Sequence, residues 1–241
     1  MNYLIGGLLG DFINCLAVPK LNFDTTGKKC NIFLSCIENE QFKTGIDQTY
    51  NDLKPILLAQ PYINKFSKYK NENIDIDMLH FRTPLKKYRK SCCYWLEFLF
   101  NFYNKKSIIK KEFKWLFHRK KDICLQDTVL LHRPFYRKLT KKSKKTYNNI
   151  ICNNNTQFLF NNEQDYESFP LRKLVTPLYV PTLLDIVTKI NSCKMFVGNQ
   201  SAYYCIANSL NKNRGIEVNR PTCWRMYERE SIYYKKVFKF G

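Results

Sequence analysis

Short apolar runs alternate with helix-like patterns along this chain, and that alternation limits its fold more than any other feature. The clearest runs are Cys30–Cys36, Asp127–Arg133 and Met195–Val197, and their largely apolar character is typical of strands buried on both faces. Helical spacing is seen in Asp47–Gln60, where Pro55 implies either a kink or a late start. A repeat of strand and helix predicts an α/β protein with parallel sheets.

The strand–helix repeat occurs twice, on either side of a basic region. We therefore predict two doubly wound parallel-sheet halves, residues 1–122 and residues 123–221. A basic helical segment at about residues 86–121 belongs to the first half. A tail of residues 222–241 is expected to pack back onto the body.

The same patterns give expectations for four other segments. The N-terminal residues predict a short strand at Tyr3–Ile5, a glycine turn and a helix that starts near Asp11. Aromatic and aliphatic residues at helical spacing within 88–120 predict two helices. Residues 134–148 are predicted to be a basic loop, and Arg214–Val218 is expected to be the last strand.

The charge of the chain is strongly positive and unevenly spread. Forty Lys and Arg against 20 Asp and Glu give a net charge of +20. Residues 86–145 hold 19 of the basic residues and 4 of the acidic ones, which is an excess of +15. Such a field attracts polyanions: nucleic acid, an anionic membrane surface, phosphorylated glycans or a nucleotide diphosphate. A solubilising surface without a specific partner is the alternative.

The spacing of cysteine and histidine argues against a structural metal or a disulfide scaffold. The ten cysteines form no CxxC pair, and His80 and His118 are far apart in sequence. Free thiols indicate a reducing compartment. The apolar N-terminus lacks a basic region and is interrupted by Asp11, so neither a signal peptide nor a transmembrane segment is expected. The sequence therefore predicts a cytoplasmic protein.

The stretch "KMFVGNQSAYYCIANSL" contains the most specific candidate site. An apolar strand stops at Gly198, and helical spacing restarts at Ala202. Between them stand Asn199, Gln200 and Ser201. Unpaired N–H groups at a helix start carry partial positive charge, so they can bind a phosphate group. A helix start that is merely capped by one of these side chains is the alternative.

A second candidate is Asp11, which follows the glycine-rich stretch "GGLLGDF". Glycines such as Gly10 let the backbone come close to a ligand. A carboxylate at this position could lie at the mouth of a cleft and remove a proton from a hydroxyl group. An ordinary N-cap role for Asp11 is the alternative.

Charged residues after two other strands complete the candidate set. Arg133 and Arg137 come at and just after the end of a buried strand, and open parallel sheets bind ligands outside the carboxyl ends of their strands. Arginine suits bidentate contacts with phosphate, although both residues could equally be exposed loop residues. Glu217, at the end of the last expected strand, could hydrogen-bond ribose hydroxyls or be a paired structural acid.

Together these segments resemble a glycosyltransferase of the GT-B fold, nearest to the heptosyltransferase type and its viral and bacterial relatives. The resemblance covers most of residues 3–218, and "FVGNQS" followed by "IA" is its most specific part. The stretches that carry it are "LIGGLLGDFINCL", "LKPILLAQPYI", "IDIDMLHFR", "VLLHRPFYR", "FLFNNEQDYESF" and "LLDIVTKINSCKMFVGNQSAYYCIANSL".

The resemblance implies two Rossmann-like halves that face each other across a cleft. It implies metal-independent, inverting transfer of a sugar from a nucleotide-diphosphate sugar to an acceptor hydroxyl, with Asp11 as the base and no cofactor beyond that co-substrate. The donor would be held by the C-terminal half. The residues that would contact its diphosphate are Asn199, Gln200, Ser201, Arg133 and Arg137.

Two alternatives stay open beside the glycosyltransferase reading. A non-catalytic protein could use the basic region at residues 86–145 and its aromatic residues to hold nucleic acid. The helical spacing of those aromatic residues favours a place in the core instead. An inactive relic of the same fold could still bind a nucleotide without transferring anything.

Overall fold

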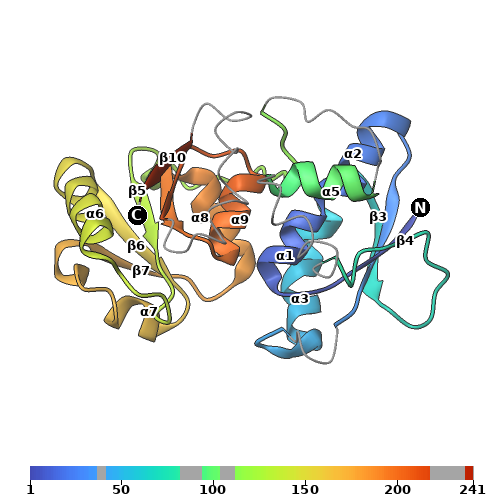
Figure 1. Cartoon of the computed structure of the whole chain (residues 1–241), viewed down its shortest axis with the longest axis horizontal. Helices are drawn as coiled ribbons and strands as arrows, with labels where there is room; N and C mark the ends of the chain where they lie inside the picture. The colour runs from blue at the N-terminus through green and yellow to red at the C-terminus, as the bar shows by residue number, and fades with distance from the viewer. Residues whose placement is uncertain (37–41, 82–93, 104–111, 218–236, 241) are drawn as a thin grey trace.

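The computed structural model describes residues 1–36, 42–81, 94–103, 112–217 and 237–240 (Figure 1). These residues form two sheets in which every pair of neighbouring strands is parallel. The first sheet has the order β3 (Ile63–Lys68), β2 (Cys30–Leu34), β1 (Asn2–Ile5) and β4 (Ile76–Asp77). The second has the order β10 (Val237–Phe240), β9 (Arg214–Glu217), β8 (Met195–Asn199), β5 (Val129–His132), β6 (Thr156–Phe160) and β7 (Thr176–Tyr179).

The predicted α/β class with parallel sheets is confirmed. Counted from β5, the second sheet has the strand order 3-2-1-4-5-6, which is the doubly wound order of dinucleotide-binding folds. In the first sheet β1 is likewise flanked by β2 and β4. Each sheet therefore has a point beside its first strand where the chain changes direction across the sheet, and ligands of such folds bind there.

Helices lie around both sheets, and we name two lobes after them. The first lobe, residues 2–103, has helices α1 (Leu9–Cys15), α2 (Ala17–Thr26), α3 (Gly45–Leu58) and α5 (Trp95–Tyr103). The second lobe, residues 123–217 and 237–240, has helices α6 (Lys141–Asn153), α7 (Glu163–Glu167), α8 (Leu183–Ser192) and α9 (Ala202–Ser209). It also has the 3-10 turns η2 (Ile123–Leu125) and η3 (Arg172–Leu174).

The central strands β5 and β8 of the second sheet are buried on both faces, as their sequences predict. In β5, Val129 and Leu131 face one apolar cluster while Leu130 faces another, since successive side chains of a strand point to opposite faces. In β8, Val197 and Phe196 divide between the same two clusters. Buried strands of this kind leave only their carboxyl ends and the following loops free to meet a ligand.

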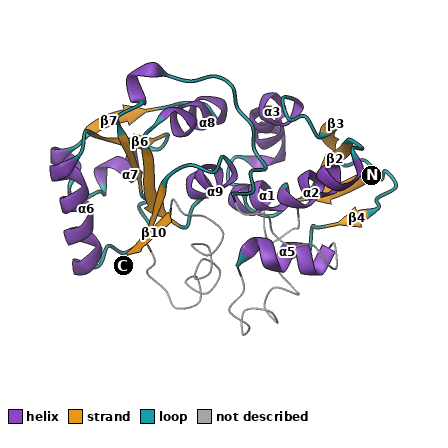
Figure 2. Cartoon of the chain, turned by 90° about the horizontal axis from the view of Figure 1, so that it is seen from above, coloured by secondary structure: helices purple, strands orange, loops and turns teal. Residues whose placement is uncertain are grey.

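The two lobes share one apolar core. It runs from Tyr3 in β1 to Ile216 in β9, and α1 packs against α9 where the lobes meet (Figures 1 and 2). Trp115, which is fully buried, connects α1 to α9 in this region. Its indole N–H donates to the carbonyl of Ile13 in α1 at 2.8 Å, and its backbone N–H donates to the carbonyl of Ser209 in α9 at 3.1 Å.

The structure corrects the expectation of two helices within 88–120. The first corresponds to α5, whereas the described residues 112–121 after it contain no helix. The backbone N–H groups of Trp115 and Leu116 both bond to the carbonyl of Ser209, so they are not available for helical hydrogen bonds. Phe113, Trp115 and Leu116 are buried as a helical core pattern would require, but they are buried by an irregular segment.

The basic loop predicted at 134–148 is also partly wrong, because α6 begins inside it at Lys141. Thr140 caps the helix, and its hydroxyl accepts the N–H of Ser143 at 3.0 Å. Ser143, Tyr147 and Ile151 form the buried face at intervals of four residues. The run of lysines hides this face in the sequence.

Other local expectations differ from the structure in detail. The helix expected near Asp11 starts at Leu9, and α3 continues through Pro55. The strand expected to be last, β9, is followed by β10, which adds to it in parallel. Most of the tail at residues 222–241 lies outside the described residues. Within the described part of the chain, no helix has the length and apolar character needed to cross a bilayer.

Candidate functional site

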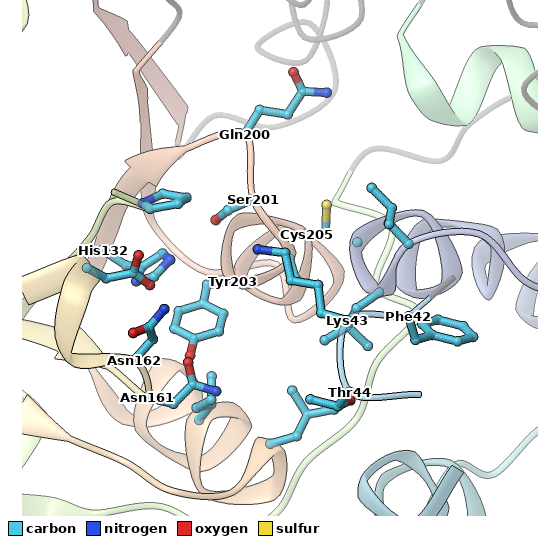
Figure 3. Close-up of a pocket in the computed structure, with 18 of the residues that line it drawn as sticks. Phe42, Lys43, Thr44, His132, Asn161, Asn162, Gln200, Ser201, Tyr203 and Cys205 are labelled. Atoms are coloured by element: carbon cyan, nitrogen blue, oxygen red, sulfur yellow. The ribbon is translucent and has the colours of Figure 1, made fainter. Parts of the chain in front are cut away.

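A pocket of about 590 Å³ lies at the carboxyl ends of strands from both sheets. Its lining residues come from the segments after β1, β2, β5, β6, β7 and β8 and from the helices α1, α3, α5, α7, α8 and α9. Figure 3 shows side chains from both lobes around it. This is the place at which doubly wound sheets bind ligands, and in the second sheet it includes the change of direction between β5 and β8.

The glycine-rich turn places Asp11 at this pocket. A Cβ atom on Gly10 would lie 3.2 Å from the Cys205 sulfur and 3.4 Å from the Cα of Ala202, so glycine lets α1 and α9 begin close together. Gly7 has φ of 85°, a left-handed conformation that favours glycine. Asp11 lies in the first turn of α1, is half-buried and lines the pocket with Gly10.

The start of α9 lies beside Asp11 in the same pocket. Ser201 is the N-cap of α9, and its hydroxyl accepts the N–H of Tyr204 at 3.4 Å. The helix start is therefore capped, as the alternative in the sequence analysis has it. Gln200 and Ser201, at the same helix start, also line the pocket (Figure 3). The Oε1 atom of Gln200 is buried and has no hydrogen-bond partner among the described residues.

Two residues of the same stretch, Gly198 and Asn199, are not among the residues that line the pocket. Gly198 lies inside the sheet, where a Cβ atom would approach the carbonyl oxygen of His132 to 2.7 Å. Its role is close packing of β8 on β5. Asn199 is 3% exposed, at the end of β8, and is absent from the pocket lining.

Arg133 and Glu217, both expected as nucleotide contacts, pair with each other in the structure. The Arg133 Nε atom donates to Glu217 Oε2 at 3.0 Å, and both side chains are buried. The hydroxyl of Tyr147 donates to the same carboxylate oxygen at 3.2 Å. Neither charged residue lines the pocket, so Glu217 is the paired structural acid that the sequence left as an alternative.

Arg137, four residues later, does line the pocket. Its Cζ atom lies 5.5 Å from the ring centre of Tyr136, and its Nε atom is buried without a hydrogen-bond partner among the described residues. The pocket thus brings together five of the residues expected from the sequence. They are Gly10, Asp11, Arg137, Gln200 and Ser201.

His132 and Tyr203 form a buried aromatic wall of the pocket that the sequence analysis missed as a pair. Their ring centres are 4.0 Å apart (Figure 3). The His132 Nδ1 atom lies 3.0 Å from the carbonyl oxygen of Leu159, so Nδ1 carries the proton and donates. Burial lowers the pKa of His132 to about 4, which keeps the ring neutral at pH 7. Its Nε2 atom is then an acceptor.

Asp165 and Asn14 are further polar residues of the pocket that sequence reasoning missed. Asp165 Oδ1 accepts the N–H of Phe135 at 2.8 Å. Burial raises the pKa of the Asp165 carboxyl, although that hydrogen bond and the charge of Lys43 oppose the shift. Asn14 Oδ1 is buried without a partner in the described structure, three residues after Asp11 on the same face of α1.

Most aromatic residues of the basic region that the structure describes are buried or half-buried, whereas Phe102, Phe135 and Tyr136 are exposed. Within the described part of the region, the buried ones are Tyr94, Trp95, Phe98, Phe100, Phe113 and Trp115. Bases of a nucleic acid stack on exposed rings, so these six offer no such platform. Within the residues that the structure describes, no three His, Cys, Asp or Glu side chains are grouped so that they could hold a metal ion.

Solved proteins with the same arrangement are known, although no protein-family model and no curated protein sequence matches the chain. The E. coli heptosyltransferase WaaC with ADP-2-deoxy-2-fluoro heptose matches with a TM-score of 0.51 and 10% identity, over 99% of this chain and 92% of that one. The fold of this chain is therefore similar to that of a heptosyltransferase.

Two further structures agree with this heptosyltransferase-like fold. A glycosyl transferase family 9 protein from Veillonella parvula matches with a TM-score of 0.56 and 8% identity, over 94% of this chain and 83% of that one. The E. coli ADP-heptose LPS heptosyltransferase II matches with a TM-score of 0.50 and 13% identity, over 99% and 90%. The resemblance expected from the sequence is thereby confirmed at the level of the fold.

Proposed function

We propose that this chain is a glycosyltransferase that transfers a sugar from a nucleoside-diphosphate sugar to an acceptor hydroxyl, without a metal and with inversion. One observation carries the proposal: Asp11 and the start of α9 at Ser201 line the same pocket, at the carboxyl ends of strands from both lobes. A solved protein of similar fold is described with ADP-2-deoxy-2-fluoro heptose, which is a nucleoside-diphosphate sugar analogue.

In the proposed reaction Asp11 is the general base. The acceptor oxygen attacks the anomeric carbon from the side opposite the diphosphate, and its proton passes to the Asp11 carboxylate. The bond from the anomeric carbon to the diphosphate oxygen breaks, and the electron pair leaves with the nucleoside diphosphate. Asn14, on the same face of α1, offers a buried amide oxygen that suits a second acceptor hydroxyl.

The departing diphosphate gains negative charge, and the second lobe supplies positive charge to meet it. The N–H groups in the first turn of α9 and the guanidinium of Arg137 are the donors we assign to it. Preorganised donors of this kind act most strongly where charge develops during the reaction, and removing one typically costs about 3–4 kcal/mol of transition-state stabilisation.

The nucleic-acid alternative loses part of its support because six of the described aromatic residues of the basic region are buried, although Phe102, Phe135 and Tyr136 are exposed. The inactive relic differs from the enzyme only in chemistry, so it is separated by assay. Thermal-shift screening against nucleoside diphosphates and nucleotide sugars comes first, because a ligand well above its dissociation constant raises the melting temperature. A response to none of these compounds would contradict the proposal.

The base assignment is tested with Asp11→Asn and the donor found by that screen. We expect donor binding and melting temperature to be kept and transfer to fall by roughly 100- to 10,000-fold, the usual contribution of a general base. Asp47→Asn is the matched control, since Asp47 also lies in the first turn of a first-lobe helix but outside the pocket. Full transfer by the Asp11 variant refutes its role, and donor binding without transfer by the native chain supports the relic.

A further inference from the structure

Lys43 belongs to the first lobe, yet its side chain reaches the second. It stands between β2 and α3, and its ammonium nitrogen lies 4.9 Å from the ring centre of Tyr136, in the loop after β5. Figure 3 shows the side chain extending into the pocket, toward the side that carries Ser201 and Tyr203. Lys43 is thus a cation that one lobe places against the other, inside the pocket lining.

Arg137 converges on the same ring from the second lobe. Its Cζ atom lies 5.5 Å from the centre of the Tyr136 ring, and the Lys43 nitrogen lies 4.9 Å from it. The two cations therefore lie within about 10 Å of each other, a separation comparable to the Debye length of about 8 Å in physiological salt, so screening leaves part of their repulsion. Neither forms an ion pair with a carboxylate of the described residues.

The pocket acid near Lys43 is engaged elsewhere. Asp165 accepts the backbone N–H of Phe135 at 2.8 Å and forms no ion pair with Lys43. Other lysines of the chain do have carboxylate partners, as Lys189 has in Asp122 at 2.5 Å. Two cations held together in a pocket, one from each lobe and neither in an ion pair with a described carboxylate, form a site that suits an anionic ligand.

We propose that Lys43 and Arg137 form a clamp that holds the diphosphate of the donor from both lobes. This inference rests on the proposed function. A diphosphate ester carries one negative charge on each phosphate, which matches one cation from each side. Arginine offers a planar fork for two phosphate oxygens, and lysine offers a compact point charge on a flexible stem. Tyr136, 53% exposed, holds both cations by contact with its ring.

The clamp also connects donor binding to the position of the base. Lys43 and Asp11 are both carried by the first lobe, so a donor held through Lys43 is fixed relative to Asp11 as well as to α9. The nucleoside diphosphate that leaves carries one more negative charge than the diphosphate of the sugar donor. Both cations therefore bind the leaving group more strongly than the donor, which favours the transition state.

The test compares full-length variants by isothermal calorimetry with inorganic pyrophosphate and with the nucleoside diphosphate that stabilises the native chain. Lys43→Met and Arg137→Met should each weaken binding of both probes by roughly 10- to 100-fold, the usual effect of losing a hydrogen bond to a charged group. Lys43→Arg keeps the charge and should keep most of the affinity.

Matched controls separate the clamp from loss of bulk positive charge. Lys54→Met removes a first-lobe lysine that also lies over a tyrosine, 5.6 Å from the ring centre of Tyr50, but outside the pocket. Arg172→Met removes an exposed arginine of the second lobe outside the pocket. Both controls should bind the probes as the native chain does.

The outcomes distinguish the clamp from the proposed function. Native affinity in Lys43→Met, or a change confined to the KM of the acceptor, overturns the clamp while the glycosyltransferase proposal stands. Pyrophosphate binding that depends on Lys43 and Arg137, in a chain that binds no nucleotide sugar, shows a diphosphate site but overturns both the donor clamp and the proposed function. Failure of pyrophosphate to bind the native chain overturns the clamp directly.

Discussion

The buried ion pair between Arg133 and Glu217 gives the sharpest prediction, because sequence and structure disagree about these residues. The sequence suggests nucleotide contacts, whereas the structure places both side chains inside the second lobe, with a distance of 3.0 Å between Nε and Oε2. We predict that Arg133→Met lowers the stability of the fold and leaves nucleotide affinity unchanged. The substitution keeps the length of an apolar stem but leaves the Glu217 carboxylate buried without its cationic partner.

The magnitude follows from the burial of the pair. The Arg133 side chain is 5% exposed and the Glu217 side chain 0%, so water cannot replace the lost guanidinium. Breaking such a pair typically costs about 3–5 kcal/mol. For a chain of this size each kcal/mol shifts the melting temperature by roughly 2–4 °C, so a fall of about 6–20 °C is expected. Adding Glu217→Gln should recover part of the loss, because the uncompensated charge is then removed.

Thermal and urea unfolding of the two single variants, the double variant and Arg137→Met measure this effect. Arg137→Met is the internal comparison: it removes an arginine from the pocket four residues away and should change the melting temperature little. The reasoning is refuted if Arg133→Met unfolds like the native chain and instead loses nucleotide binding. That result would return Arg133 to the ligand site where the sequence had placed it.

Two further predictions concern His132 and Gly10. The pKa of His132 is about 4 in the folded chain against about 6.5 when unfolded, so the unfolded state binds the extra proton and stability falls as the pH drops from 6.5 toward 4. The loss in the free energy of unfolding should approach about 3 kcal/mol. His132→Gln should flatten this part of a stability–pH curve measured by urea unfolding. His80→Gln, at an exposed position, is the control and should leave the curve unchanged. Gly10→Val should lower stability by about 1–3 kcal/mol in the same assay, and Gly10→Ala by less, because the added methyl groups press on Cys205 and Ala202 across the contact between the lobes.

The positions of several strands, and their alternation with helices, could be predicted from the sequence because buried parallel strands are short, continuous apolar runs. Cys30–Leu34, Val129–His132 and Met195–Asn199 all lie where such runs stand. The helix at Lys141–Asn153 could not be predicted in this way, since the three residues of its buried face stand among lysines. The segment at 112–121 shows the opposite error: aromatic residues at helical spacing are buried there without a helix, through hydrogen bonds to α9.

Residues of the candidate site could be predicted from the sequence where they follow the end of a strand. Asp11, Arg137 and Ser201 follow the strands at Asn2–Ile5, Val129–His132 and Met195–Asn199, and parallel strands bring such positions to one edge. Glu217 also stands at a strand end, but no local signal shows that its partner is Arg133, which is 84 residues away. Asn14 could have been found, because it stands three residues after Asp11 on one helix face.

Bulk charge was a poor guide to the place of function in this chain. The excess of +15 at residues 86–145 is its most conspicuous compositional feature. Among the arginines and lysines of that region that the structure describes, Arg137 lines the pocket, while Arg133 is neutralised inside the second lobe.

The second pocket cation, Lys43, comes from outside that region, in a stretch with no unusual charge. A ligand with two charges on adjacent phosphates responds to two cations that line one pocket, whereas the sum of distant surface charges is screened by salt. If the clamp proposal is correct, neutralising lysines of α6 such as Lys141 and Lys144 should weaken the long-range attraction of the protein for an anionic ligand. Association at low salt should then be slower. The dissociation rate of a bound nucleoside diphosphate should then depend on Lys43 and Arg137 and not on those lysines, because close contacts govern release whereas distant charge governs encounter.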